Sequence, residues 1–174
     1  VRINVLEGRL GAIRIDPASR PPLSDARILG MLSQGQAANT PLNLDRLDRA
    51  VSLVNDTPGV KITAALAPGQ SDAQSDIVVR GESKGWGGGT VSLDNTGSRS
   101  TGYERLSAGL TFDNPSENGD QISLNLMGSR GVRYGRVGYT LPIGYGGWRV
   151  GVNSSEMSYE LVGSFASTQA KGRS

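Results

Sequence analysis

The sequence predicts two successive parts, an α+β module with the element order β-α-α-β-β and then an antiparallel β-meander. Three observations lead to this prediction. In the first half, helical stripes of apolar residues lie between alternating stretches. From Trp86 onward, alternating segments of about ten residues follow one another, separated by turn residues. The 25 glycines cluster from Gly81 onward, which favours strands and turns over helices there.

The module begins with a strand-like stretch over residues 1–15, in which apolar and polar residues alternate and Gly8 and Gly11 interrupt the pattern. Prolines in the next residues predict a loop. Ser24 and Asp25 can cap a short helix. One face of that helix carries Ile28, Leu29 and Leu32.

A second helix is predicted over residues 44–55, with Asn43 as its N-cap. Residues 57–59 (Thr-Pro-Gly) end this helix, because proline lacks an amide donor and glycine permits a turn. Alternation then predicts a strand over residues 60–66 and a last short strand over residues 77–79. The apolar stripe of the helix consists of Leu44, Leu47, Val51 and Val54.

The alternating segments of the second part place apolar residues on one face and polar residues on the other. Such a meander is typical of a soluble sheet packed on a core or of a transmembrane barrel that turns its apolar face to lipid. A strand length of about 9–11 residues suits the barrel, but the pattern alone leaves both environments open. The apolar residues are Val91, Leu93, Leu106, Ala108, Leu110, Phe112, Ile122, Leu124, Leu126, Val137, Tyr139, Leu141, Trp148, Val150 and Val152.

Composition excludes several kinds of chemistry. The chain has no His and no Cys, so it cannot form a Ser-His-Asp or Cys-His arrangement or a zinc site built on those residues. Its net charge of +2 does not by itself indicate nucleic-acid binding. Asp94, Asp113 and Asp120 lack the spacing of a calcium loop and lie at turns, where such side chains cap their own backbone. We predict no catalytic residue and no metal, cofactor, nucleotide or nucleic-acid site.

The two ends of the chain lead to a further expectation. The first residues do not form a signal peptide, and no apolar run of about 18 residues predicts a transmembrane helix. Because the first residues resemble the middle of a strand, we expect the chain to be a segment of a longer protein.

Several short phrases resemble those of a known family, in the same order along the chain. In the second part they are residues 92–98 (SLDNTGS), 101–103 (TGY), 113–115 (DNP), 119–121 (GDQ) and 139–144 (YTLPIG). In the first part they are residues 5–10 (VLEGRL), the helix over 44–54, residues 57–60 (TPGV) and residues 66–69 (LAPG). By these phrases the chain resembles the two-partner secretion transporters of the outer membrane, the hemolysin activation/secretion (ShlB/FhaC/HecB) family.

The resemblance implies a domain organisation and a location. Residues 1–7 would be the last strand of a preceding POTRA domain, and residues 8–83 would be a POTRA domain in the periplasm. Residues 84–174 would form about the first five antiparallel strands of a barrel in the outer membrane of a Gram-negative cell. The implied function is protein transport. The POTRA module would capture the amino-terminal secretion domain of an exported partner, which would pass unfolded through the barrel pore.

An extended partner chain can bind by adding a strand to an open sheet edge. The strand over residues 60–66 is the candidate if it lies outermost, together with the adjacent helix. The candidate partner-binding residues are Lys61, Ile62, Thr63, Ala65, Ile28 and Leu32. The alternative is that this strand is a plain edge whose apolar residues pack on their own helices.

Three arginines, Arg105, Arg136 and Arg149, share the inferred polar face. They would line a positive pore, or they would be solvated or paired with acids such as Asp94 and Glu104. The sequence also leaves two other functions open. One is an assembly factor for outer-membrane proteins from the same superfamily, and the other is a soluble β-rich binding protein or adhesin.

Overall fold

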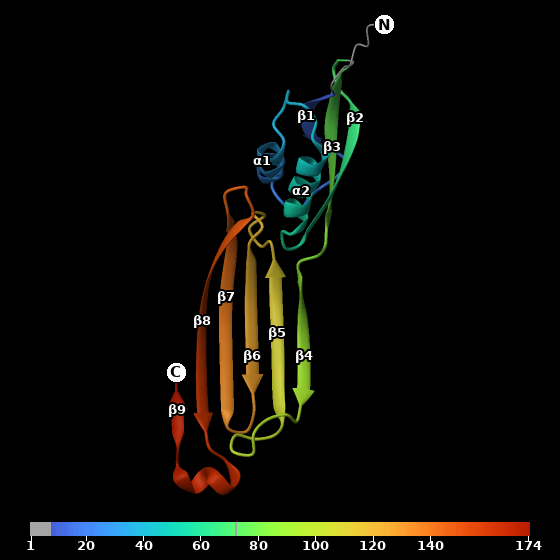
Figure 1. The fold of residues 1–174 in the computed structure, drawn as a ribbon. Helices are drawn as coiled ribbons and strands as arrows, with labels where there is room; N and C mark the ends of the chain where they lie inside the picture. The colour runs from blue at the N-terminus through green and yellow to red at the C-terminus, as the bar shows by residue number, and fades with distance from the viewer. Residues whose placement is uncertain (1–7, 72) are drawn as a thin grey trace. The chain divides into compact units, whose positions relative to one another are not determined.

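The computed structural model describes residues 8–71 and 73–174, and within these ranges the chain is rich in strands and has few helices (Figure 1). This β-rich character was predicted. The chain forms two compact units. Of the described residues, the first unit contains 8–71, 73–86, 114–120 and 141–150, and the second contains 87–113, 121–140 and 151–174. The strand expected over residues 1–7 lies outside the described residues.

A three-stranded sheet forms one layer of the first unit. Its strands are β1 (Arg9–Ile15), β2 (Val60–Pro68) and β3 (Gln74–Ser83). β3 lies in the middle, parallel to β1 and antiparallel to β2. It is longer than the strand predicted over residues 77–79, because polar residues on both sides of that apolar stretch also pair with the neighbouring strands.

A bulge in β1 explains one of the glycines. The register of β1 against β3 shifts between Leu10 and Ile13. Asp76 fills this place, where its Oδ1 accepts a hydrogen bond from the amide of Ala12 at 2.8 Å. A Cβ on Gly11 would collide with the same oxygen, so a larger residue at this position would displace the Asp76 carboxylate from the bulge.

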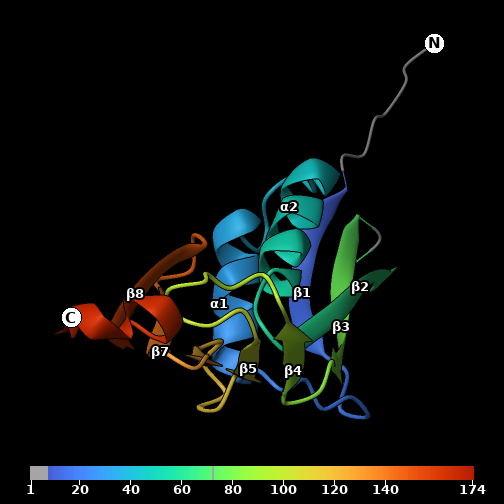
Figure 2. The same ribbon diagram turned by 90° about the horizontal axis from the view of Figure 1, so that it is seen from below.

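Two helices, α1 (Asp25–Gly35) and α2 (Leu44–Asn55), lie side by side against the sheet (Figure 2). α2 has the predicted bounds, and Asn43 caps it by accepting a hydrogen bond from the amide of Arg46 at 3.0 Å. Ser24 precedes α1, but the prediction that its side chain caps the helix is wrong. The carbonyl of Ser24 begins the helix instead, by accepting from the amides of Arg27 and Ile28.

The apolar core of the molecule lies between these helices and the sheet. Of the predicted helical stripes, Leu29 is half-buried and Leu44 is exposed, whereas Met31, which the stripe did not include, is buried. The core consists of Leu10, Leu23, Ile28, Met31, Leu32, Leu47, Ala50, Val54, Val60, Ile62, Ile77 and Val79.

The second sheet is a meander in which each strand pairs with the next in sequence (Figure 1). Its last strand is short and follows a 3₁₀ helix, η1 (Gly163–Thr168); the sequence predicts neither element. The strands are β4 (Gly87–Asp94), β5 (Arg105–Asp113), β6 (Gln121–Gly128), β7 (Val132–Ile143), β8 (Trp148–Glu160) and β9 (Lys171–Arg173).

The strand register aligns the predicted apolar residues into rows on one face. One row runs from Leu110 through Leu124 to Val137, and the next runs from Phe112 through Ile122 to Tyr139. No second layer buries this face within the described residues, and many of its large side chains are exposed, including Leu93 at 77% and Trp148 at 79%. An uncovered apolar face of this kind marks a surface that contacts another protein or a membrane.

The helices of the first unit are short. Within residues 8–71 and 73–174, neither α1 nor α2 combines the length and apolar character that crossing a bilayer requires.

Candidate functional site

The first candidate surface is the free edge of β2. The strand order places β2 at the outside of the three-stranded sheet, as the capture hypothesis requires. Part of this edge is already occupied, because the Asn55 side chain at the end of α2 binds Ile62 twice. Its Oδ1 accepts from the Ile62 amide at 2.6 Å, and its Nδ2 donates to the Ile62 carbonyl at 3.1 Å. Asn55 therefore acts as a one-residue substitute for a neighbouring strand.

The rest of the edge follows from antiparallel geometry. Along an edge strand, the backbone groups of alternate residues point to the neighbouring strand and to the open side. The amide and carbonyl of Ile62 point to the open side, where Asn55 binds them. The amides and carbonyls of Ala64 and Leu66, two and four residues further along, therefore point to the open side too. Leu66 is half-exposed at 50%. Within residues 8–71 and 73–174, the outward donors and acceptors of Ala64 and Leu66 have no hydrogen-bond partner, and they lie next to an exposed apolar side chain.

The exposed candidates Lys61, Thr63 and Ala65 lie on the face of the sheet opposite the core. Lys61 is paired with Glu82 at 3.9 Å. Thr63 stands opposite Arg80 of β3. The candidates Ile28, Leu32 and Ile62 lie in the core, so contact with a partner through β2 depends on the exposed side chains and the edge backbone.

An ion pair fixes the same outer face of the module. Arg80 Nε donates to Asp16 Oδ2 at 2.7 Å. The pKa of the Asp16 carboxyl is lowered, first by the amide of Ala18, which donates to it, and second by the hydrogen bond from Arg80. Both donors favour the charged carboxylate. Because the Arg80 side chain is exposed and Asp16 is only half-buried, water screens the pair, which fixes side-chain position more than it stabilises the fold.

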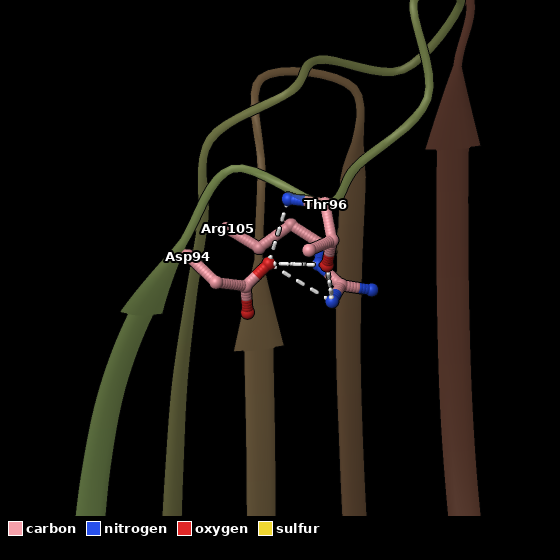
Figure 3. Close-up of polar contacts among 3 residues, drawn as sticks. All are labelled: Asp94, Thr96 and Arg105. Carbon is pink, nitrogen blue, oxygen red and sulfur yellow. Dashed lines mark hydrogen bonds and ion pairs between the residues drawn. The ribbon is translucent and has the colours of Figure 1, made fainter.

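The second candidate surface is the polar face of the meander. Arg105 and Arg136 both lie on this face. Arg136 stands opposite Asn125, which in turn stands opposite Gly109 of β5. Gly109 and Arg105 are four residues apart on β5, so their side-chain positions share one face. Arg105 is not free. Its guanidinium pairs with Asp94 at 2.9 Å and donates to the hydroxyl of Thr96 (Figure 3). The pairing with an acid, one of the two alternatives from the sequence, therefore holds for Arg105.

Asp94 also organises the turn after β4. Its Oδ1 accepts from both the amide and the hydroxyl of Thr96, at 3.0 and 2.6 Å. Asp120 plays a similar part in the turn after β5, where its Oδ1 accepts from the amide of Ser116 at 3.1 Å. These carboxylates cap turns as the sequence predicted. Among the described residues, no group of three or more acids could hold a metal ion.

Arg149 belongs to the first unit, and its guanidinium donates to the carbonyl of Gly119 at 3.1 Å. A second arginine of this unit, which the sequence did not single out, has a similar role. Arg27 of α1 donates to the carbonyl of Gly144 at 2.8 Å and lies 5.7 Å from the ring centre of Tyr145. No local signal marks Arg27, because its partners are more than a hundred residues away along the chain.

Comparison with known proteins gives matches over the whole chain. The family model described as "Haemolysin secretion/activation protein ShlB/FhaC/HecB" matches residues 73–174. The heme/hemopexin transporter protein HuxB of Haemophilus influenzae (strain ATCC 51907 / DSM 11121 / KW20 / Rd) is 30% identical over 176 residues, which cover 100% of this chain and 31% of the relative. The chain thus spans less than a third of that relative's length.

Solved structures share the fold. CdiB from Escherichia coli matches with a TM-score of 0.61 and 25% identity, over 90% of this chain and 33% of that one. BamA from Haemophilus ducreyi, in a structure lacking POTRA domains 1-3, matches with a TM-score of 0.64 and 19% identity, over 88% of this chain and 28% of that one. The likeness to BamA is one of fold alone.

Proposed function

Because the chain belongs to the haemolysin secretion/activation protein family (ShlB/FhaC/HecB), we propose that it is part of an outer-membrane transporter of two-partner secretion. Residues 8–83 serve as a POTRA module in the periplasm. Residues 84–174 form the start of a transmembrane barrel. The module captures an exported partner protein by its amino-terminal secretion domain, and the partner passes through the pore unfolded, without a nucleotide or a cofactor.

The uncovered apolar face of the meander is the observation that carries this proposal. In water, rows such as Leu110, Leu124 and Val137, in which Leu110 and Val137 are exposed, would leave apolar surface uncovered. In lipid the same rows are favourable, and the alternation of apolar and polar faces is the pattern of a barrel strand. This argues against the soluble binding protein or adhesin.

Family membership favours secretion over the assembly-factor alternative. Relatives of the chain include a heme/hemopexin transporter protein and the outer membrane transporter CdiB. The likeness to BamA is at 19% identity and extends to the fold, which hosts more than one function.

Capture of the partner occurs at the open edge of β2. An incoming strand can bind the outward backbone groups of Ala64 and Leu66, while the exposed side chain of Leu66 packs against it. Asn55 blocks the edge at Ile62 and so limits how far the new strand extends. Lys61, Thr63 and Ala65 remain candidates for side-chain contacts on the adjoining outer face.

Two substitutions at one position test this mode of capture in the full-length transporter. Leu66→Pro removes the outward amide and the side chain, whereas Leu66→Ala removes the side chain alone. Proline is tolerated on an edge strand when its missing amide faces away from the ladder. We expect secretion of the partner to fall by about tenfold more in Leu66→Pro than in Leu66→Ala, the loss that follows from one buried backbone hydrogen bond.

Secreted partner in the culture medium provides the measurement, and the amount of transporter in the outer membrane provides the control. Circular dichroism of both purified variants checks that the fold is retained. Equal secretion by the two variants, with both folded, would show that the edge backbone of β2 does not hold the partner.

A further inference from the structure

A basic pocket lies at the end of β7, β8 and β9. It has a volume of about 500 Å³ and lies wholly within the second unit. The charged residues of its lining are Arg130, Arg133, Glu160, Lys171 and Arg173. Four of these side chains are cations and one is a carboxylate, so the lining carries a net positive charge.

Most of these cations have no acidic partner. Arg173 pairs with Glu156, which lies outside the lining. Arg130, Arg133 and Lys171 make no ion pair with any acid in the part of the chain that the structure describes. Unpaired cations held close together repel one another, and an anion of high charge relieves that repulsion. The pocket therefore suits an anionic ligand.

The charged side chains lie on the same face as the apolar rows. Along β7, Arg133 has the same parity as Val137 and Tyr139. Along β9, Lys171 stands opposite Glu160 and Arg173 opposite Ser158. β8 in turn places Glu160 and Ser158 on the face of Trp148 and Val152.

The surroundings of two glycines show which residues of β7 and β8 lie on the same face of the sheet. A Cβ on Gly151 would touch Oγ1 of Thr140, and one on Gly138 would touch Cβ of Asn153. These pairs lie on the polar face, so the residues between them share the apolar one. The apolar face thus becomes charged at one end of the strands.

The direction of that end follows from the chain path. β4 begins at Gly87, next to the end of β3 in the module, and each strand of the meander reverses direction. β7 therefore begins at the end away from the module junction, and Arg133 lies there. With the module in the periplasm, as the proposed function has it, this end lies at the outer leaflet.

The position of the charges also fits the thickness of the apolar layer. From Ile143 to Arg133, β7 spans about 33 Å at roughly 3.3 Å per residue. A strand tilt of about 40° reduces this to about 25 Å along the membrane normal, the height of the apolar band of a barrel. Arg133 therefore lies at the level of the headgroups if Ile143 lies at the periplasmic boundary.

From the pocket, its unpaired cations and its level on the lipid face, we infer that it binds the phosphate groups of a glycolipid headgroup in the outer leaflet. Arginine gives bidentate hydrogen bonds to phosphate oxygens, and lysine adds a point charge. The ligand is thus a lipid held at the rim of the sheet, not a substrate of transport. This inference rests on the proposed membrane orientation.

The test uses the purified full-length transporter in detergent and two forms of lipid A, with and without its phosphates. Native mass spectrometry and titration measure binding. We expect the phosphorylated form to bind about tenfold more tightly. Arg133→Gln and Lys171→Gln should each remove most of that preference. Arg99→Gln, which removes a cation of the loop between β4 and β5 outside the pocket, should leave it unchanged.

Three results would overturn the inference. They are equal binding of the two lipids, an equal loss in Arg99→Gln, and displacement of the lipid by inorganic phosphate at the same concentration, which would assign the pocket to a free anion. Insertion of the transporter into phosphatidylcholine vesicles distinguishes a failure of this inference from a failure of the proposed function. A transporter that inserts but binds both forms of lipid A equally refutes this inference alone. A transporter that does not insert refutes the proposed function as well.

Discussion

Replacing Leu110 with Arg tests whether the apolar face of the second unit contacts lipid. Leu110 lies in the middle of β5, between Gly89 of β4 and Leu124 of β6. It is 38% exposed, so a longer side chain at this position can leave the sheet without displacing a packed neighbour. The effect of the substitution therefore reports the environment outside the sheet.

The two environments predict different magnitudes. At the centre of an apolar band in a bilayer, an arginine costs about 2–4 kcal/mol. That range corresponds to a change of about thirtyfold to several hundredfold in the unfolding equilibrium. In water, the same substitution at a partly exposed position changes stability by about 0.5 kcal/mol or less.

Thr111→Arg provides the matched control. Thr111 is the next residue of β5 and lies on the polar face between Gly88 and Ser123, with no cation opposite. Urea unfolding of the full-length transporter in phospholipid vesicles, followed by tryptophan fluorescence, measures both variants. Equal midpoints for Leu110→Arg and Thr111→Arg, or a Leu110→Arg variant as stable as the wild type, would refute the assignment of this face to lipid.

Two further predictions concern the module. Asn55→Ala removes both hydrogen bonds to Ile62 and should weaken the local structure by about 1–3 kcal/mol; hydrogen exchange at Ile62 should rise, while Asp56→Ala should leave it unchanged. The lowered pKa of Asp16 means that its stabilising contribution is present above the ordinary value of 3.8 and is lost as the pH falls through the lower folded value. Acid unfolding followed by circular dichroism should therefore depend on pH less steeply in Asp16→Asn than in the wild type, and identical curves would contradict this account.

Features with short-range causes could be predicted from the sequence. The bounds of α2 follow from its N-cap Asn43, its apolar stripe and the Thr-Pro-Gly stop, all within a few residues. The rows of the meander could also be predicted, because alternation fixes the face of each residue and short turns bring successive strands together. The pairing of Arg105 with Asp94 was one of two alternatives, since the β4–β5 hairpin places them opposite each other.

Features that depend on how separate elements pack could not be predicted. Asn55 lies at the end of a helix, where asparagine usually serves the helix itself, and nothing local indicates that it caps Ile62 of the next strand. The basic pocket combines Arg133 with Lys171 from a strand of three residues, too short for an alternating pattern. The first arrangement depends on how the end of α2 packs beside β2. The second depends on which strands become neighbours, and the sequence carries no local pattern for either.

The surfaces of the two units suit different surroundings, water for the first and lipid for the second. In the part of the chain that the structure describes, the outward backbone groups of Ala64 and Leu66 on β2 have no partner along that edge. Each such group would cost several kcal/mol in hydrocarbon. The rows through Leu124 and Ile122 have the opposite requirement, since their apolar side chains are uncovered and gain by leaving water. One chain satisfies both conditions only if the environment changes between β3 and β4. The residues between those strands, 84–86, are therefore the place at which we expect the chain to pass from the periplasm to the membrane.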